Sequence, residues 1–422
     1  MRIKKKYHLK DLQSFKKKAL KWGSSQTHCC YLNGNSKIYS YESFPEILAV
    51  GCVQEFTNDE PDFTDFLNKV SKLKDWAFGF LGYNSRDVEM KSAYFLPGLF
   101  FVPSTIITFS KENIISVETN GDPEMILKEI NDITPDFSKN KIKGAFIAEI
   151  SRDEYIKKIR ILKSHLQRGD IYQINYCIKF ESEGIYYDPY LIYDVLNLAS
   201  PMPFSGFFKA RDYCIVCASP ERFLKKLNAK IISQPMKGTS PVFADQAENI
   251  KSISDLKSSE KERAENIMIV DLVRNDLSTI CQYGTVKVEK LCDVYSFQNV
   301  HQMVSTVTGK LAEDLSTAEI FAKTFPMGSM TGAPKIRAMQ LIVDLEISSR
   351  GPFSGTMGFM DPKGNFDFNV LIRSMFYNSH TGKGFYSAGS GITILSDPEK
   401  EYEECMLKGE TLKNIFNPDP LS

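Results

Sequence analysis

The sequence lacks an excess of charge of either sign, and it lacks any long apolar run. Its 422 residues include 52 lysines and arginines against 52 aspartates and glutamates, so the formal net charge is zero. A neutral chain has no broad positive surface for a nucleic acid backbone or an anionic membrane. No apolar stretch approaches the roughly 18 to 20 residues of a membrane helix, and the charged start leads into no signal-type hydrophobic region. We therefore expect a cytoplasmic protein that binds neither nucleic acid nor membrane.

The sequence also lacks a framework of paired cysteines. The nine cysteines are odd in number, scattered, and mostly flanked by apolar residues, which is typical of reduced and buried thiols. Cys214 and Cys217 have the spacing of half a zinc site, but no second pair or histidine lies nearby in the sequence. A metal at this pair is not expected.

No internal repeat and no regular alternation of strands with helices is present. Apolar residues at helical spacing over 11–22 and 151–168 contrast with short apolar stretches that are separated by Gly, Pro, Asn and Asp. The polar segment 131–144 predicts a connection between an N-terminal region, 1–130, and a second region, 145–416, of one interleaved fold. The irregular mixture of helices and strands favours an α+β fold.

The segment 260–276 is apolar nearly all round in its middle, which predicts a buried helix. Glu265 shares a face of this helix with Met268, Ile269 and Leu272, at i+3, i+4 and i+7. An isolated buried charge is too costly, so this carboxylate must be paired or coordinated. The residues alone favour a salt bridge and leave a metal open.

A C-terminal helix is predicted from the start signal at 396–398 to about Phe416. Glu401, Glu404 and Lys408 fall on one stripe of this helix, at i, i+3 and i+7. Ordinary surface ion pairs would explain them. Alternatively, the two carboxylates could bind a divalent ion and the amine could bind an acidic substrate.

Two glycine-containing segments, 325–335 and 388–392, allow backbone amides to approach a ligand closely. The first leads into a proline-initiated helix, which suits an anion, but it lacks the spacing of a phosphate-binding loop. A carboxylate is therefore a better ligand than a nucleotide. Lys237 lies beside Gly-Thr in a tight turn, and it is a candidate nucleophile only if its surroundings keep it neutral.

Taken together, several segments resemble the chorismate-utilising enzymes, the family of anthranilate synthase component I and its relatives. The resemblance is strong over about 145–416 and weaker in the N-terminal third, where 76–83 matches. The matching segments are, in order, 169–175, 218–223, 235–239, 264–276, 300–305, 328–334, 350–356, 371–374 and 388–392, followed by the helix with Glu401, Glu404 and Lys408. The fold that this resemblance implies is a large antiparallel β-sandwich flanked by helices.

The resemblance also implies a magnesium site and a substrate site. By this resemblance Glu265 and Glu404 bind Mg²⁺ directly, and Glu401 binds it through water. Hard oxygen ligands with retained water suit Mg²⁺, which would meet the ring carboxylate of chorismate. The implied substrate-binding residues are Arg373, Lys408, Thr239, His301 and Gln173, with the backbone at Gly389, Ser390 and Gly391.

Two positions distinguish the members of the family. The members of the family that add water carry a lysine base at the position of Gln173. A glutamine cannot deprotonate water, so the addition of water is disfavoured, whereas ammonia needs no such base. Where anthranilate synthases have alanine, this chain has Lys237, as in the aminodeoxychorismate synthase branch. The implied reaction is Mg²⁺-dependent amination of chorismate at C4 through a covalent Lys237 intermediate, with Glu221 as the general acid, on the route to p-aminobenzoate and folate.

The resemblance leaves the ammonia source and two rivals to consider. The sequence has no Gly-x-Cys-x-Gly-x-Gln amidotransferase motif, so ammonia is expected from a separate glutamine amidotransferase subunit or from solution. Val242 stands where many relatives have an arginine. No tryptophan-binding motif matches near 30–33, so feedback inhibition by tryptophan is not expected. Anthranilate synthase is the rival within the family, and a non-catalytic module that docks an amidotransferase is the rival of another class.

Overall fold

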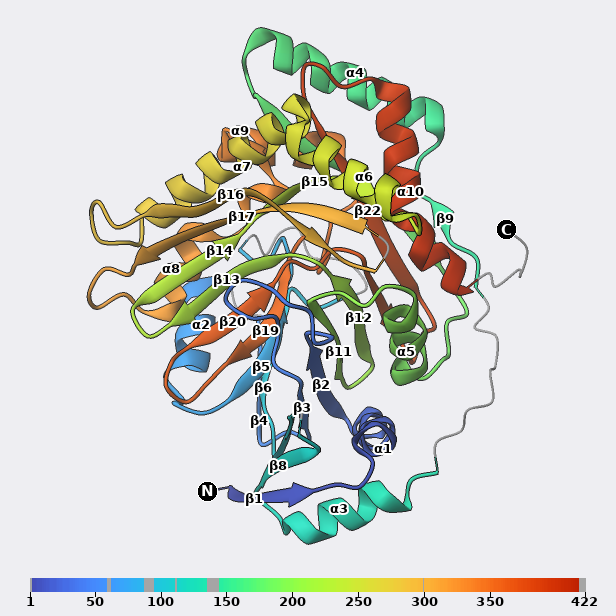
Figure 1. Cartoon of the computed structure of the whole chain (residues 1–422), viewed down its shortest axis with the longest axis vertical. Helices are drawn as coiled ribbons and strands as arrows, with labels where there is room; N and C mark the ends of the chain where they lie inside the picture. The colour runs from blue at the N-terminus through green and yellow to red at the C-terminus, as the bar shows by residue number, and fades with distance from the viewer. Residues whose placement is uncertain are drawn as a thin grey trace.

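Two large antiparallel sheets pack against each other and form the framework of the molecule (Figure 1). The computed structural model describes residues 2–58, 62–86, 95–110, 112–134, 144–298 and 300–416. Every strand pairing within these ranges is antiparallel. The expected antiparallel β-sandwich flanked by helices is confirmed.

The first sheet has twelve strands and joins segments that lie far apart in the sequence. For example, Cys30 in the N-terminal third pairs with Phe208 near the middle of the chain. In order of pairing the strands are β1 (Ile3–His8), β8 (Ile114–Thr119), β7 (Thr105–Phe109), β3 (Ile47–Val50), β2 (His28–Asn33), β11 (Phe204–Ala210), β12 (Tyr213–Ser219), β21 (Ser374–Asn378), β22 (Gly384–Ile392), β10 (Gln173–Ser182) and β18 (Gly332–Ala333), with β9 (Ile147–Ala148) beside β10.

The second sheet has ten strands and again joins distant segments, since Gly79 pairs with Gly358. Its strands are β15 (Met236–Pro241), β17 (Val300–Lys310), β14 (Lys230–Gln234), β13 (Arg222–Leu227), β20 (Phe366–Asn369), β19 (Thr356–Met360), β5 (Ala77–Leu81), β6 (Gly98–Val102) and β4 (Gln54–Thr57), with β16 (Lys287–Ser296) beside β17.

Helices cover the outer faces and the ends of the two sheets (Figure 1). They are α1 (Leu12–Ser25), α2 (Phe63–Ser71), α3 (Pro123–Asp132), α4 (Arg152–Arg168), α5 (Pro189–Ala199), α6 (Gln246–Ser258), α7 (Glu260–Ser278), α8 (Thr317–Thr324), α9 (Lys335–Leu345) and α10 (Pro398–Phe416). α6 and α7 contact β15, β16 and β17, whereas α10 contacts β22 and α4. None of the helices in these described ranges has the length and apolar character needed to cross a lipid bilayer.

Local signals fix the helix ends that position the site. Ser151 and Glu154 form a reciprocal capping box at the start of α4, and Gly169 ends that helix in the left-handed region, with φ of 79°. Asp397 accepts a hydrogen bond from the Lys400 amide at 3.0 Å before α10. The helices expected over 151–168 and 398–416 are confirmed.

Three further predictions concern the helix at 260–276, the cysteines and the connection at 131–144. The helix expected over 260–276 is α7, which continues to Ser278. The expectation that this helix is buried is wrong, because only one face packs against the sheet, whereas Ala264, Ile267 and Asp271 are exposed on the other face. All nine cysteines are free thiols, and most of them are buried. The connection expected at 131–144 lies mostly outside the described residues.

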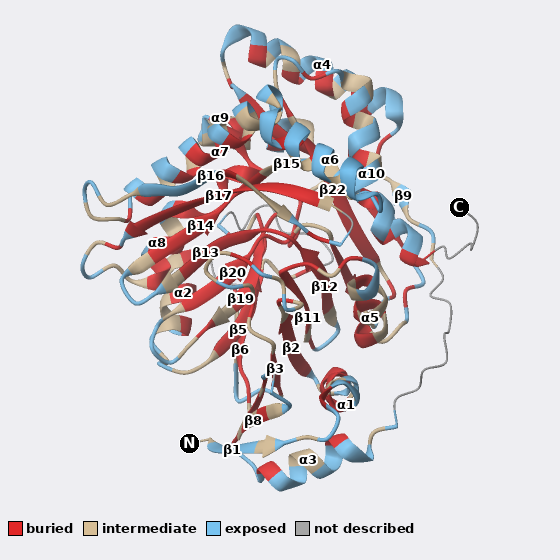
Figure 2. Cartoon of the chain, viewed as in Figure 1, coloured by how far each residue is buried: buried red, intermediate tan, exposed pale blue. Residues whose placement is uncertain are grey.

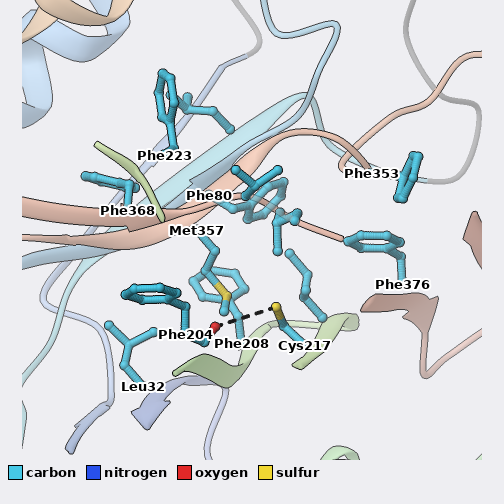
Figure 3. Packing of buried hydrophobic residues seen from close by; sticks show 14 of the residues in the cluster. Leu32, Phe80, Phe204, Phe208, Cys217, Phe223, Phe353, Met357, Phe368 and Phe376 are labelled. Atoms are coloured by element: carbon cyan, nitrogen blue, oxygen red, sulfur yellow. Dashed lines mark hydrogen bonds between the residues drawn. The ribbon is translucent and has the colours of Figure 1, made fainter. Parts of the chain in front are cut away.

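The hydrophobic core lies between the sheets, where the buried strands contrast with the exposed outer faces of the helices (Figure 2). Figure 3 shows aromatic side chains from both sheets meeting in this layer. The rings of Phe80 on β5 and Phe208 on β11 meet edge to face with centroids 5.4 Å apart. Each fully buried phenylalanine stabilises the fold by about 1.5–3 kcal/mol, so this layer holds the two sheets together.

Candidate active site

A cavity of about 300 Å³ lies where β15, β22, α7 and α10 come together. It contains charged side chains of both signs, although the chain as a whole is neutral. The residues that line it are Asn175, Pro220, Glu221, Met236, Lys237, Gly238, Thr239, Lys261, Glu262, Glu265, Gln302, Ser329, Met330, Phe353, Ile372, Arg373, Ser387, Ala388, Gly389, Gly391, Glu401, Glu404 and Lys408.

Lys237 enters the cavity at an irregularity in β15. The register with β17 shifts between Met236 and Thr239, and Gly238 has φ of 91°. A bulge of this kind redirects the local side chains, and Lys237, Gly238 and Thr239 all line the cavity. The structure therefore brings the expected nucleophile and Thr239 into one site.

The surroundings of Lys237 favour its neutral form. Burial of the amine lowers the pKa of Lys237, and the positive charge of Lys408 lowers it further. Glu265, Glu221 and Glu404 oppose this effect. The net shift is in the direction that a lysine nucleophile needs.

Glu221 follows β12 and is only 3% exposed. Burial raises the pKa of Glu221 to about 7, against the opposing effects of a Ser329 hydrogen bond and the Lys237 charge. A carboxyl group with this pKa holds its proton near neutral pH and can donate it. The expected general acid and the expected nucleophile thus line the same cavity.

Four carboxylates line the cavity from α7 and α10: Glu262, Glu265, Glu401 and Glu404. Two of them have lysine partners, because Lys408 Nζ lies 2.6 Å from Glu404 and Lys261 Nζ lies 3.9 Å from Glu265. Burial raises the pKa of Glu265, and the negative charge of Glu262 contributes. The ionised carboxylates repel one another, and a cation would relieve this repulsion.

The donor set fits a Mg²⁺ ion that retains water. Within the described ranges no group of three or more His, Cys, Asp or Glu side chains lies close enough to hold a metal ion alone. Mg²⁺ commonly uses one or two carboxylates together with water and substrate oxygens. Glu265 and Glu404 both line the cavity and would supply the two carboxylates, and the buried Glu401 of α10 also belongs to the lining.

The expected carboxylate-binding groups also lie in the cavity wall. Arg373 precedes β21, and burial lowers the pKa of its guanidinium. Lys408 donates to the Gly389 carbonyl at 3.1 Å in addition to its contact with Glu404. Gly389 and Gly391 line the cavity from β22.

Three expected substrate-binding residues lie behind the wall. The ring nitrogens of His301 contact Ser296 and Asn249, each at 2.8 Å. The Ser390 hydroxyl lies 3.3 Å from that of Tyr155, on the face of β22 opposite Gly389 and Gly391. Gln173 is buried, and a Cβ at Gly391 would lie 2.8 Å from its Nε2.

The sequence interpretation missed other residues of the wall: Asn175, Gln302, Ser329, Met330 and Glu262. Gln302 follows His301 on β17, and successive strand residues point to opposite faces. Its Oε1 atom is buried without a hydrogen-bond partner in the described structure. The segment 300–305 resembles a motif of the family, but only the register of β17 with β15 shows that Gln302 faces the cavity.

The chain has the fold of the chorismate-utilising enzymes, and it belongs to that family. The family model described as chorismate binding enzyme matches residues 27–414. Anthranilate synthase component I of Streptococcus pneumoniae has the same fold, with a TM-score of 0.74 and 28% identity over 90% of this chain and 95% of that chain.

Curated relatives of this chain include two aminodeoxychorismate synthase components. Component 1 of Escherichia coli is 39% identical over 259 residues, which cover 61% of this chain and 56% of the relative. Component 1 of Bacillus subtilis is 31% identical over 312 residues, or 74% of this chain and 66% of the relative. The matched part is less than two thirds of the length of these relatives.

Proposed function

We propose that the chain aminates chorismate at C4 with ammonia and forms 4-amino-4-deoxychorismate. The observation that carries this proposal is the presence of Lys237 and Glu221 in one cavity with their pKa values shifted in the useful directions. The aminodeoxychorismate synthase component 1 relatives support the same activity.

The proposed reaction has two displacement steps. In the first, the neutral amine of Lys237 forms a bond to C2 of chorismate, both double bonds of the ring diene shift by one position, and the C4 hydroxyl leaves as water. Glu221 donates the proton to that hydroxyl. In the second, ammonia forms a bond to C4, both ring double bonds return to their first positions, and the Lys237 nitrogen leaves C2 as the neutral amine. The new ammonium group at C4 then returns one proton to Glu221.

Gln173 explains why ammonia rather than water is the second nucleophile. It is buried behind Gly391, beside Lys237. An amide cannot take a proton from water, so hydroxide is not generated there. Neutral ammonia is a stronger nucleophile than water and needs no base, but it must arrive as the neutral molecule.

The substrate is proposed to bind through its carboxylates. Arg373 and Lys408 line the cavity and supply positive charge, while the backbone at Gly389 and Gly391 allows a close approach. Bound Mg²⁺, held by Glu265 and Glu404 and through water by Glu401, would offset the charge of the ring carboxylate. A separate glutamine amidotransferase subunit is the proposed source of ammonia.

Product identification tests this proposal. The protein is incubated with chorismate, Mg²⁺ and an ammonium salt, without any added lyase, and the products are identified by mass spectrometry. We expect 4-amino-4-deoxychorismate. Direct formation of anthranilate would overturn the assignment in favour of anthranilate synthase.

The non-catalytic alternative is tested by the same assay. A module that only docks an amidotransferase consumes no chorismate, and Lys237→Ala and Glu265→Ala would leave the assay unchanged. We expect both substitutions to reduce chorismate consumption.

A further inference from the structure

The chain passes from one sheet to the other at two adjacent places in the wall of the cavity. The first crossing, residues 218–222, leads from β12 to β13, and the second crossing, residues 369–374, leads from β20 to β21. Cys217 pairs with Ser374 on one side of the crossings, and Arg222 pairs with Asn369 on the other side. The two crossings therefore lie side by side and run in opposite directions.

Each crossing carries one residue of the proposed chemistry. Glu221, the proposed general acid, belongs to the first crossing, and Arg373, which is proposed to bind a substrate carboxylate, belongs to the second. The backbone of Arg373 is left-handed, with φ of 49°. A residue with a side chain adopts this conformation at a cost and keeps it only where its surroundings hold it. The contacts between the crossings therefore decide where these two side chains lie.

Three hydrogen bonds join the crossings to each other. The Ala218 amide donates to the Arg373 carbonyl at 3.1 Å, and the Val370 amide donates to the Glu221 carbonyl at 3.0 Å. The third hydrogen bond comes from a side chain, since the Ser219 hydroxyl donates to the Val370 carbonyl at 2.6 Å. The carbonyl groups of both site residues are thus held by the opposite crossing.

Ser219 also holds the backbone of Glu221 directly. Its hydroxyl oxygen accepts a hydrogen bond from the Glu221 amide at 3.2 Å, so one hydroxyl group bridges Glu221 and Val370. Ser219 is 0% exposed, so neither of its partners could turn to water in its place. The loss of a buried hydrogen bond of this kind leaves unsatisfied polar groups behind.

We propose that Ser219 is a positioning residue that fixes Glu221 and Arg373 relative to each other. Because its hydroxyl joins the two crossings, the acid that protonates the C4 hydroxyl and the cation that binds a carboxylate of the same substrate are held as one unit. The effect on catalysis rests on the proposed amination, whereas the joining of the crossings does not.

A neighbouring ion pair should keep the region folded when Ser219 is replaced. The Arg222 guanidinium forms two hydrogen bonds with Asp367, at 2.8 and 2.9 Å, and both residues are buried. This pair joins β13 to β20 independently of Ser219. Ser219→Ala is therefore expected to fold. Ser219→Cys, which fills the same space with a weaker hydrogen-bonding group, is a second variant with the same expected effects.

A double-mutant cycle tests the positioning role. Ser219→Ala should lower kcat by about tenfold in the wild type, but by less than about twofold in Glu221→Gln, where the acid is already lost. Ser205→Ala is the matched control. Ser205 is equally buried and lies opposite Ala218 on β11, but its hydroxyl donates to the Met202 carbonyl at 3.0 Å. Its kcat should equal that of the wild type. An equal loss from Ser219→Ala in both backgrounds would overturn the inference, because a general weakening of the fold does not depend on the acid.

Hydrogen exchange provides a readout that needs no turnover. Exchange of the Ala218 and Val370 amides is followed by mass spectrometry of peptides from the ligand-free wild type, Ser219→Ala and Ser205→Ala. In Ser219→Ala both amides should exchange about 3- to 10-fold faster, as the loss of one hydrogen bond implies. This result without any consumption of chorismate by the wild type would support the joining of the crossings and refute only the proposed function. Unchanged exchange, or an equal change in Ser205→Ala, overturns the inference.

Discussion

A Cβ atom at Gly391 would lie 3.0 Å from Nζ of Lys237 and 2.8 Å from Nε2 of Gln173. Because Gly391 has no side chain, the ends of the Lys237 and Gln173 side chains can occupy the space beside it. Both are the far ends of flexible side chains, so a methyl group at position 391 would displace them rather than the backbone.

We expect Gly391→Ala to remain folded but to lose activity. Small misplacements of reacting groups can cost up to about 100-fold in rate, so kcat/KM for chorismate should fall by about 10- to 100-fold. Steady-state kinetics and thermal unfolding measure the two effects. Gly121→Ala is the control, because a Cβ there meets only the Thr119 hydroxyl, at 3.8 Å. Equal activity of Gly391→Ala and wild type would contradict the crowding argument.

The pH dependence of the rate should report Glu221. Its carboxyl group must be protonated to act as an acid, and burial raises its pKa to about 7. The rate should therefore fall as the pH rises through about 7. Glu221→Gln cannot donate the proton, so its kcat should be about 10²- to 10⁴-fold lower, and its rate should no longer fall as the pH rises through about 7. If the same fall in rate persists in Glu221→Gln, the titrating group is another one.

Removal of one proposed metal ligand should weaken Mg²⁺ binding. We expect Glu265→Gln and Glu404→Gln each to raise the Mg²⁺ concentration needed for half-maximal activity by at least about tenfold, since even outer-sphere changes cost this much. Calorimetric titration with Mg²⁺ checks binding without turnover. Glu410→Gln, on the exposed side of α10, should change neither value. An unchanged Mg²⁺ affinity in both ligand variants would refute the proposed site.

A half-buried ion pair joins α7 to α9 and should contribute to stability. Lys335 Nζ lies 2.6 Å from Asp276, and burial raises the pKa of Asp276 to about 6. Lys335→Met leaves this carboxylate without its partner, so the free energy of unfolding should fall by about 1.5–3 kcal/mol. Lys335→Met/Asp276→Leu should recover much of the loss in denaturant unfolding. A single variant as stable as the wild type would show that the pair contributes little.

Local patterns in the sequence predicted some of the helices, because apolar spacing and start signals depend on neighbouring residues. The spacing of apolar residues over 151–168 placed α4, and the 396–398 segment placed the start of α10. The apolar neighbours of Glu265 correctly required a compensating charge, which Lys261 supplies at i−4. The sequence also predicted ion pairs along one side of α10, and Lys408 does pair with Glu404 there.

The rest of the site depends on contacts between distant segments. Whether His301 or Gln302 faces the cavity depends on the register of β17 with β15, in which Gln302 pairs with Thr239. Arg350 reaches a carbonyl 175 residues away in the sequence. No local sequence pattern determines such contacts. The resemblance to the family identified the motifs, but it did not show which of their side chains face the cavity.

The most direct test of the central claim is peptide mapping by mass spectrometry after exposure to chorismate and Mg²⁺ without ammonia, comparing the wild type with Lys237→Ala. We expect a peptide containing Lys237 that is heavier by chorismate less one water, and no such adduct in Lys237→Ala. An adduct of equal abundance in the variant would refute the covalent role of Lys237, as would amination of chorismate by Lys237→Ala at the wild-type rate.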